Sequence, residues 1–230
     1  MRRFSPYFTR ALAATSLTPN AVTALMIPTG LLTALAVSIP SLLAAALAVL
    51  LGQFQLLLDC ADGELARWRR RYSPAGLYVD HLAHGVTEAA LPAALGIRAD
   101  GGWDSLGGWT SVGLVISALV LLLKSETHLV EVVLGRLGQP VTEDGPPPAA
   151  GRWRLRQGWR LVPFLRPFHW VEATLLAFAA AVVDFLADDL LGSRILLVAL
   201  LAFAVVAVVG NATSILASDR LRAGAREGSD

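Results

Sequence analysis

Residues 58–84 read LDCADGELARWRRRYSPAGLYVDHLAH, a short basic turn with acidic residues on both sides of it. Apolar stretches precede and follow this segment, so the sequence predicts two antiparallel helices joined by a tight connection. Asp59 and Asp62 are three residues apart on the first helix. Asp80 and His84 are four residues apart on the second. Each pair therefore shares one helix face, and we expect the two polar faces to converge at one end of a helical bundle.

The composition indicates an integral membrane protein. Of the 230 residues, 55% are hydrophobic and 16% are charged, and the mean hydropathy is +0.58. Soluble domains average about 45–50% apolar and about 25% charged residues. These values argue against a small water-soluble enzyme and give no support to nucleic-acid binding. The single cysteine excludes an internal disulfide and a cysteine-based zinc cluster.

Six apolar stretches predict an all-α bundle, because backbone in hydrocarbon must satisfy its own hydrogen bonds. We expect membrane spans at 20–38, 40–58, 75–97, 108–123, 168–186 and 195–216. A single membrane-embedded domain then covers residues 1–230. Its N-terminal segment, 1–19, contains an interfacial helix at 3–17, whose apolar face carries Phe4, Tyr7, Phe8 and Leu12. A signal peptide is the alternative interpretation of this segment.

The basic residues predict the orientation of the bundle. With six spans, all of the 19 Lys and Arg residues except Arg98 and Arg194 fall on one side of the bilayer. An excess of positive charge is typical of cytoplasmic loops. We therefore expect a multi-pass protein of the cell membrane, with both termini and the acidic residues on the cytoplasmic side.

The longest polar interruption is a basic loop at 135–167 that is rich in proline and glycine. After its proline-rich centre, Trp153 and Trp159 alternate with arginines in the segment that runs to Arg166. This pattern predicts an interfacial segment that contacts anionic headgroups. A contact with a phosphorylated substrate is the alternative, because arginine clusters also bind phosphate.

The acidic residues have the chemistry of a metal site. Carboxylates brought close together repel one another unless a cation neutralises them, and hard oxygen ligands favour Mg²⁺ or Mn²⁺. Such an ion keeps positions open for substrate phosphates, which indicates phosphoryl transfer. Gly63 and Gly76 leave bare backbone where a nucleotide or a neighbouring helix approaches closely. The alternative for Asp59 and Asp62 alone is a solvated helix end paired with nearby arginines.

The spacing resembles the signature of the CDP-alcohol phosphotransferases, DxxDGxxARx8GxxxDxxxD. Seven of its eight fixed positions match, with the eight-residue gap intact. The matching residues are Asp59, Asp62, Gly63, Ala66, Arg67, Gly76 and Asp80. Residues 17–23, LTPNAVT, also resemble the usual entry into the first span of that family.

The resemblance implies a reaction and assigns roles to these positions. Asp59, Asp62 and Asp80 would coordinate divalent metal between the protein and a CDP-alcohol donor such as CDP-diacylglycerol. Gly63, Ala66 and Gly76 would line the CDP pocket, and Arg67 would help to hold it together. A hydroxyl acceptor would attack the phosphorus distal to the cytidine and release CMP during phospholipid or related lipid synthesis. The resemblance also implies a homodimer, whereas the acceptor alcohol has no comparable motif.

His84 stands where the signature ends with an aspartate that serves as the base and as a metal ligand. Neutral imidazole accepts a proton near pH 7 and also binds metal, so His84 is the candidate general base. Three alternatives remain open: a working enzyme with a histidine base, an enzyme with a shifted substrate, and a silent relative that binds nucleotide or lipid. A small cation-coupled transporter is a rival from another class, because acidic residues inside spans also mark ion paths.

Several further polar residues lie within or beside the predicted spans. Glu88 continues the face of His84 by one turn, where it either tunes the imidazole or bonds to another span. We interpret the residues at the ends of the fourth and fifth spans as interfacial anchors, with contact to an acceptor as the alternative. We expect the acidic residues of the last connection to be a solvated loop, and Asn211 to bond between helices. The residues at the span ends are His128, His169 and Glu172. The acidic residues of the last connection are Asp184, Asp188 and Asp189.

Overall fold

The computed structural model describes residues 5–70, 73–136 and 170–216. These residues form seven α-helices and a short 3₁₀ helix, with no strand among them. The elements are α1 (Ser5–Ala13), α2 (Pro19–Ser38), α3 (Leu42–Arg69), α4 (Pro74–Asp100), η1 (Trp103–Ser105), α5 (Gly108–Arg136), α7 (Trp170–Ala187) and α8 (Leu191–Leu216). The prediction of an all-α fold is therefore confirmed.

The helix lengths and hydropathies are those of a multi-pass membrane protein. Five segments are long and apolar enough to cross a bilayer: α2, α3, residues Gly108–Val130 of α5, α7 and α8. The third predicted span corresponds to α4, which has 27 residues but is not among those five. Its apolar character is interrupted by Asp80, His84, Glu88 and Arg98. α4 nevertheless lies inside the bundle, in contact with α2, α5, α7 and α8.

Two helices extend well beyond their predicted ends, because hydropathy falls before the helix stops. The second span was expected to end at residue 58, whereas α3 continues to Arg69. Arg70 then adopts a left-handed conformation, φ 49°, and its amide donates to the carbonyls of Ala66 and Arg67. The fourth span was expected to end at residue 123, whereas α5 continues to Arg136. The added turns of α3 carry Asp59 and Asp62 within a regular helix.

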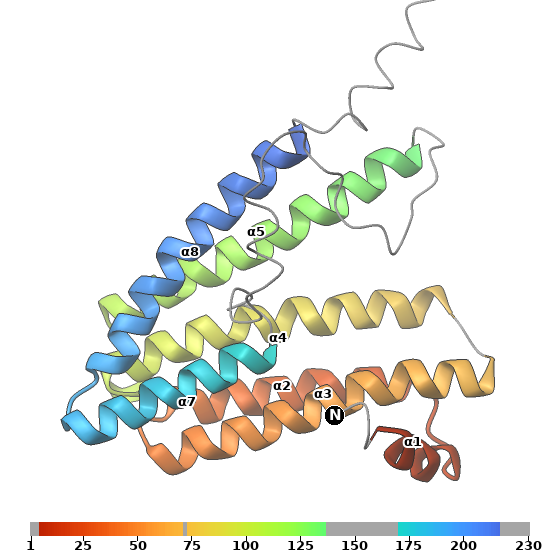
Figure 1. The fold of residues 1–230 in the computed structure, drawn as a ribbon, viewed down its shortest axis with the longest axis horizontal. Helices are drawn as coiled ribbons and strands as arrows, with labels where there is room; N and C mark the ends of the chain where they lie inside the picture. Colours follow the sequence, from red (N-terminus) through yellow and green to blue (C-terminus); the bar gives the residue numbers. More distant parts are fainter. Residues whose placement is uncertain (1–4, 71–72, 137–169, 217–230) are drawn as a thin grey trace, which may run out of the picture.

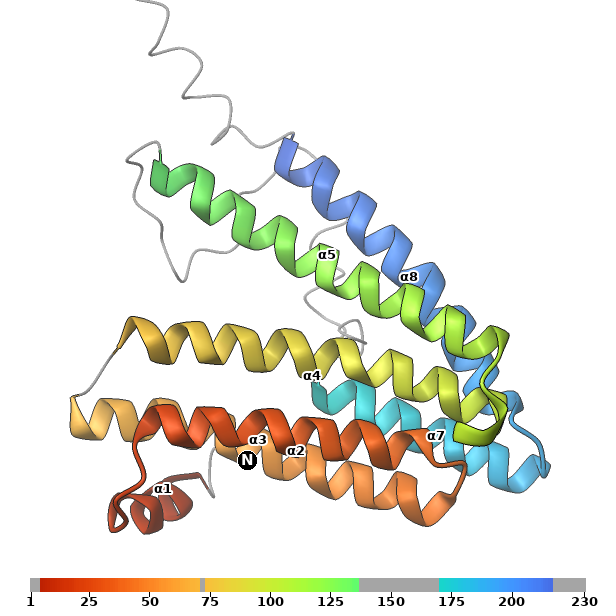
Figure 2. The same cartoon turned by 180° about the vertical axis from the view of Figure 1, so that it is seen from behind.

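The bundle has two parts that meet at one end (Figures 1 and 2). α2 packs against both α3 and α4, and α7 packs against α3. α5 and α8 lie side by side. They meet the other helices at one end and diverge from α4 towards the opposite end (Figure 2). α3 and α4 run antiparallel, as their short connection predicts (Figure 1). Small residues allow α4 and α5 to approach closely, since a Cβ on Gly96 would lie 2.5 Å from the carbonyl oxygen of Trp109.

A buried ion pair holds the helix ends on the side where α4 finishes. Nε of Arg98 lies 3.3 Å from Oδ2 of Asp184, and both side chains are nearly inaccessible. Arg98 also donates to the carbonyl of Ile39, and Asp184 accepts from the amide and hydroxyl of Ser193. The prediction that Asp184 belongs to a solvated loop is therefore wrong, because Arg98 meets it from another helix. The neighbouring Asp188 and Asp189 are exposed, as predicted.

The N-terminal helix α1 lies against α3 and is fixed there by polar contacts. Glu64 of α3 accepts hydrogen bonds from the hydroxyls of Ser5 and Thr9. Phe8 makes an edge-to-face contact with Phe54 at 6.2 Å between ring centroids. Tyr7 is 77% exposed, whereas Phe8 and Leu12 pack against buried residues of the bundle. A helix is present over Ser5–Ala13, within the segment predicted to be interfacial, and its place at a membrane surface stays a prediction. Phe4 lies outside the described residues.

Candidate functional site

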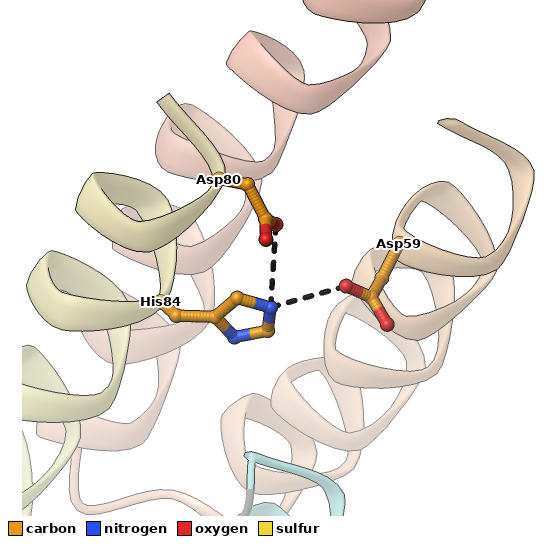
Figure 3. Close-up of side chains that lie close together, drawn as sticks. All are labelled: Asp59, Asp80 and His84. Carbon is orange, nitrogen blue, oxygen red and sulfur yellow. Dashed lines mark hydrogen bonds and ion pairs between the residues drawn. The ribbon is translucent and has the colours of Figure 1, made fainter. Parts of the chain in front are cut away.

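Asp59, Asp80 and His84 converge between α3 and α4 (Figure 3). Nε2 of His84 lies 3.1 Å from Oδ1 of Asp59 and 3.5 Å from Oδ1 of Asp80. One ligand atom from each residue lies within 4.8 Å of the other two. The three side chains are about one-third exposed, so small solutes can reach them. The predicted convergence of two polar faces is present in this group.

Helix geometry explains why these residues meet. Asp80 and His84 are one turn apart on α4 and therefore point to the same side. Asp59 faces them from α3, while α2 packs against both helices from the side. Figure 3 shows the imidazole reaching across the space between the two ribbons to Asp59. The three side chains thus fill the space between the helices, and their polar atoms remain partly accessible.

Glu88 extends the cluster by one turn of α4. Its Oε1 lies 3.4 Å from Nδ1 of His84, and its Oε2 lies 3.0 Å from Nζ of Lys124 on α5. The two ring nitrogens of His84 therefore face different carboxylates, Glu88 on one side and Asp59 and Asp80 on the other. Lys124 is a member of this network that the sequence pattern did not indicate, because the interaction joins residues 36 positions apart on separate helices.

Asp62 occupies a separate position on α3. Its Oδ2 accepts a hydrogen bond of 2.7 Å from the hydroxyl of Thr23 on α2. That hydroxyl also lies 3.1 Å from the carbonyl of Pro19. Within the described residues, the candidate ligand group consists of Asp59, Asp80 and His84, without Asp62. A metal-binding role for Asp62 stays a prediction, and Thr23 is the contact that sequence reasoning missed.

The remaining residues predicted for the CDP pocket surround the same ends of α3 and α4. The Arg67 guanidinium lies over Gly63, where a Cβ would come within 3.4 Å of Nη1. A Cβ on Gly76 would come within 2.6 Å of Oδ1 of Asn20, so the glycine lets α2 approach α4. Ala66 is half-buried on α3. These positions are compatible with a pocket, but contact of these residues with a nucleotide stays a prediction.

The other predicted polar residues have different outcomes. Asn211 donates to Glu126 at 2.9 Å, so the expected bond between helices is confirmed. The ring of His128 lies against that of His81, with 4.7 Å between centroids. Glu172 lines a cavity that also contains Asp59 and His84. His169 and the basic segment at 152–166, with the rest of the loop from 137 onwards, lie outside the described residues.

α4 has no polar side chain between Glu88 and Arg98. Between Glu88 and the Arg98 ion pair, the buried residues of α4 are Leu91, Pro92, Ala94, Leu95, Gly96 and Ile97. A cation path would need polar groups through this depth. The described side chains of α4 therefore supply no ligand for a cation path between Glu88 and Arg98.

Comparison with known proteins agrees with the sequence motif. The family model described as CDP-alcohol phosphatidyltransferase matches residues 16–136, which is more than half of the 230-residue chain. The matched region contains α2 to α5 and all residues of the candidate cluster. No curated protein matches the chain.

Proposed function

Because the chain belongs to the CDP-alcohol phosphatidyltransferase family, we propose that it transfers a substituted phosphate from a CDP-alcohol to a hydroxyl acceptor. The proposed donor is CDP-diacylglycerol or a similar CDP-linked lipid, and CMP is the leaving group. The reaction belongs to phospholipid or related lipid biosynthesis. The observation that carries the proposal is the meeting of Asp59, Asp80 and His84 between two helices, inside the region that the family model matches.

The donor set fits a divalent metal ion. Two carboxylates and an imidazole place one atom each within 4.8 Å of one another, and carboxylate oxygens suit Mg²⁺ or Mn²⁺. Asp59 and Asp80 would hold the ion together with Asp62. His84 would be a ligand in place of Asp62 if it does not act as the base. The ion would neutralise charge on the diphosphate and align the displacement.

His84 is suited to accept the proton of the acceptor hydroxyl. Each ring nitrogen faces a carboxylate, Nδ1 towards Glu88 and Nε2 towards Asp59. To act as the base, the ring would have to be neutral with its proton on Nδ1, which would leave the lone pair of Nε2 for the acceptor hydroxyl. In the proposed reaction, the hydroxyl oxygen bonds to the phosphorus distal to the cytidine, and its proton passes to Nε2. The bond from that phosphorus to the bridging oxygen breaks, and CMP departs with the electron pair.

The remaining proposed roles follow from position. Gly63, Ala66 and Gly76 would let the nucleotide approach the helix backbone, and the Arg67 guanidinium would stabilise this part of the pocket. We also propose that the site and both termini face the cytoplasm, because of the basic-residue distribution. A homodimer is proposed from the family alone.

A catalytically silent nucleotide- or lipid-binding protein is the second candidate. The specific observation that favours it is His84, which replaces one negative charge of a site that would otherwise contain four aspartates. A variant with His84→Asp separates the two candidates. If the histidine is the base, His84→Asp lowers CMP release. If the chain is silent, this change creates turnover.

The test measures CMP release from CDP-diacylglycerol by the full chain in lipid nanodiscs, with and without Mg²⁺ or Mn²⁺. The acceptors are supplied as a mixture of small alcohols and their phosphates. We expect metal-dependent release, and a decrease of about a hundredfold or more in Asp80→Asn, as for loss of a transition-state electrostatic contact. Asp104→Asn, an exposed acid in η1, is the matched control and keeps its rate. Equal rates in Asp80→Asn and the unmodified chain would overturn the proposal.

A further inference from the structure

A cavity of about 340 Å³ adjoins the candidate cluster. Asp59 and His84 form part of its wall, and the remaining polar lining comes from Gln55, Glu88, Trp170 and Glu172. The lining residues belong to four helices, because Met26 of α2 joins residues of α3, α4 and α7. Small-molecule sites typically have volumes of about 300–1,000 Å³. The cavity is therefore large enough for a small alcohol next to the proposed base.

Two buried polar atoms of this lining have no hydrogen-bond partner in the described part of the chain. The Gln55 side chain donates to Thr87 through Nε2, whereas its Oε1 accepts nothing. Nε1 of Trp170 is an unused donor. Gln55 is 2% exposed and Trp170 is 6% exposed, so bulk water does not satisfy these atoms. A ligand hydroxyl, which both donates and accepts, would satisfy either atom if its side chain turned towards the cavity.

The charge of the lining limits the kind of alcohol. The cavity wall has three carboxylates, and none of the described residues that line it is Lys or Arg. Asp59 contacts His84, and Glu88 is paired with Lys124. Glu172 has no ion-pair partner among the described residues, and it lies in the first turn of α7, where the helix dipole stabilises a carboxylate. Among the described lining residues, three carboxylates outnumber the single imidazole of His84, so a phosphate group placed against Glu172 would be repelled.

We propose that this cavity is the acceptor subsite and that it selects a small alcohol without a phosphate group, either uncharged or positively charged. The inference rests on the proposed function, since it gives the hydroxyl that reacts a place beside His84. It differs from what the basic segment at 152–166 suggested, namely a phosphorylated acceptor.

The test compares matched pairs of acceptors in nanodiscs that contain CDP-diacylglycerol and Mg²⁺. The pairs are glycerol with glycerol 3-phosphate and inositol with inositol 1-phosphate, and choline is included as a cationic alcohol. We expect CMP release with a kcat/KM at least about tenfold higher for choline or for the unphosphorylated member of a pair than for either phosphate. A phosphorylated alcohol as the best acceptor would overturn the inference while leaving the proposed transferase function intact.

A charge reversal tests the cavity itself. Glu172→Lys should raise the ratio of phosphorylated to unphosphorylated turnover by about tenfold, because it replaces a repelling carboxylate with a cation. Glu172→Gln should shift the ratio in the same direction without adding length to the side chain. Asp104→Lys makes the same change of charge beyond the far end of α4, and it should leave the ratio within about twofold. An unchanged ratio in both Glu172 variants would contradict the proposed subsite.

Ligand binding separates failure of the inference from failure of the proposed function. If none of the alcohols releases CMP, the transferase proposal fails, and the cavity is then tested by thermal stabilisation of the chain with millimolar choline or glycerol 3-phosphate. Stabilisation by choline that is lost in Glu172→Lys supports the subsite. Stronger stabilisation by glycerol 3-phosphate, or none by either compound, overturns it.

Discussion

Oε1 of Glu88 lies 3.4 Å from Nδ1 of His84, one helix turn away on α4. The same carboxylate is held by Lys124 of α5 at 3.0 Å. This pair fixes the direction of the imidazole, so that its other nitrogen faces Asp59 and Asp80. The proposed base is therefore oriented by a helix outside the α3–α4 pair.

Replacing Glu88 by glutamine should lower kcat for CMP release by about 10- to 100-fold, the range found for residues that orient a ligand or base. Glu88 acts here as a positioning residue, so the KM for the CDP-alcohol should remain within about twofold. Steady-state kinetics with varied donor concentration would measure both parameters. A KM increase with unchanged kcat would contradict the positioning role.

The Thr23 hydroxyl should matter for donor binding because it orients Asp62 at 2.7 Å. A hydrogen bond to a charged group contributes about 1.5–3 kcal/mol, so Thr23→Val should raise the KM for the donor by about tenfold or more. Thr23→Ser keeps the hydroxyl and should restore binding. Equal KM values for the valine and serine variants would show that Asp62 does not depend on this contact.

The buried pair of Arg98 and Asp184 should be essential to stability. Removing one member leaves the other charge uncompensated, so Arg98→Leu should cost about 3–5 kcal/mol of unfolding free energy. The double variant Arg98→Leu with Asp184→Leu should recover part of that loss. Arg194→Leu removes a more exposed contact with Asp189 and a hydrogen bond to the carbonyl of Ala99, and should cost about 1–2 kcal/mol. Denaturant titration in detergent micelles would distinguish these values.

Close packing of α4 and α5 should be intolerant of one added methyl group. A Cβ on Gly113 would overlap the carbonyl oxygen of Pro92, so Gly113→Ala should separate the two helices and lower the melting temperature. Gly210 of α8 has no atom near the place of its absent Cβ. Gly210→Ala should therefore keep or raise stability by up to about 1 kcal/mol. A lower melting temperature for Gly210→Ala than for Gly113→Ala would contradict this packing.

Much of the fold could be predicted because hydropathy and helical periodicity are local properties. The positions of the spans follow from runs of apolar residues, and the face shared by Asp80 and His84 follows from their spacing. Helix ends were less predictable at 58–69 and 124–136, where polar residues continue a helix after the apolar run has ended. Hydropathy measures transfer into hydrocarbon and does not report where a helix stops.

Contacts between distant helices account for what the sequence could not indicate. The motif predicts the same metal-binding role for Asp59, Asp62 and Asp80. In the structure, Thr23 of α2 bonds to Asp62, and His84 lies beside Asp59 and Asp80. Likewise, Asp184 follows an apolar stretch and resembles the start of a loop, but Arg98 lies 86 positions earlier in the chain. Such pairs depend on the relative placement of whole helices.

The length of α3 has a consequence for how a fatty donor would arrive. Its 28 residues extend about 42 Å, whereas the hydrocarbon layer is about 30 Å thick. With Leu42 at one edge of that layer, Asp59 lies about 25 Å along the axis, just beneath the opposite edge. A lipid donor that diffuses laterally in the leaflet would bring its diphosphate to Asp59 by moving only slightly deeper into the bilayer. Its acyl tails would remain among their neighbours, so the reaction would proceed without extracting the molecule into water.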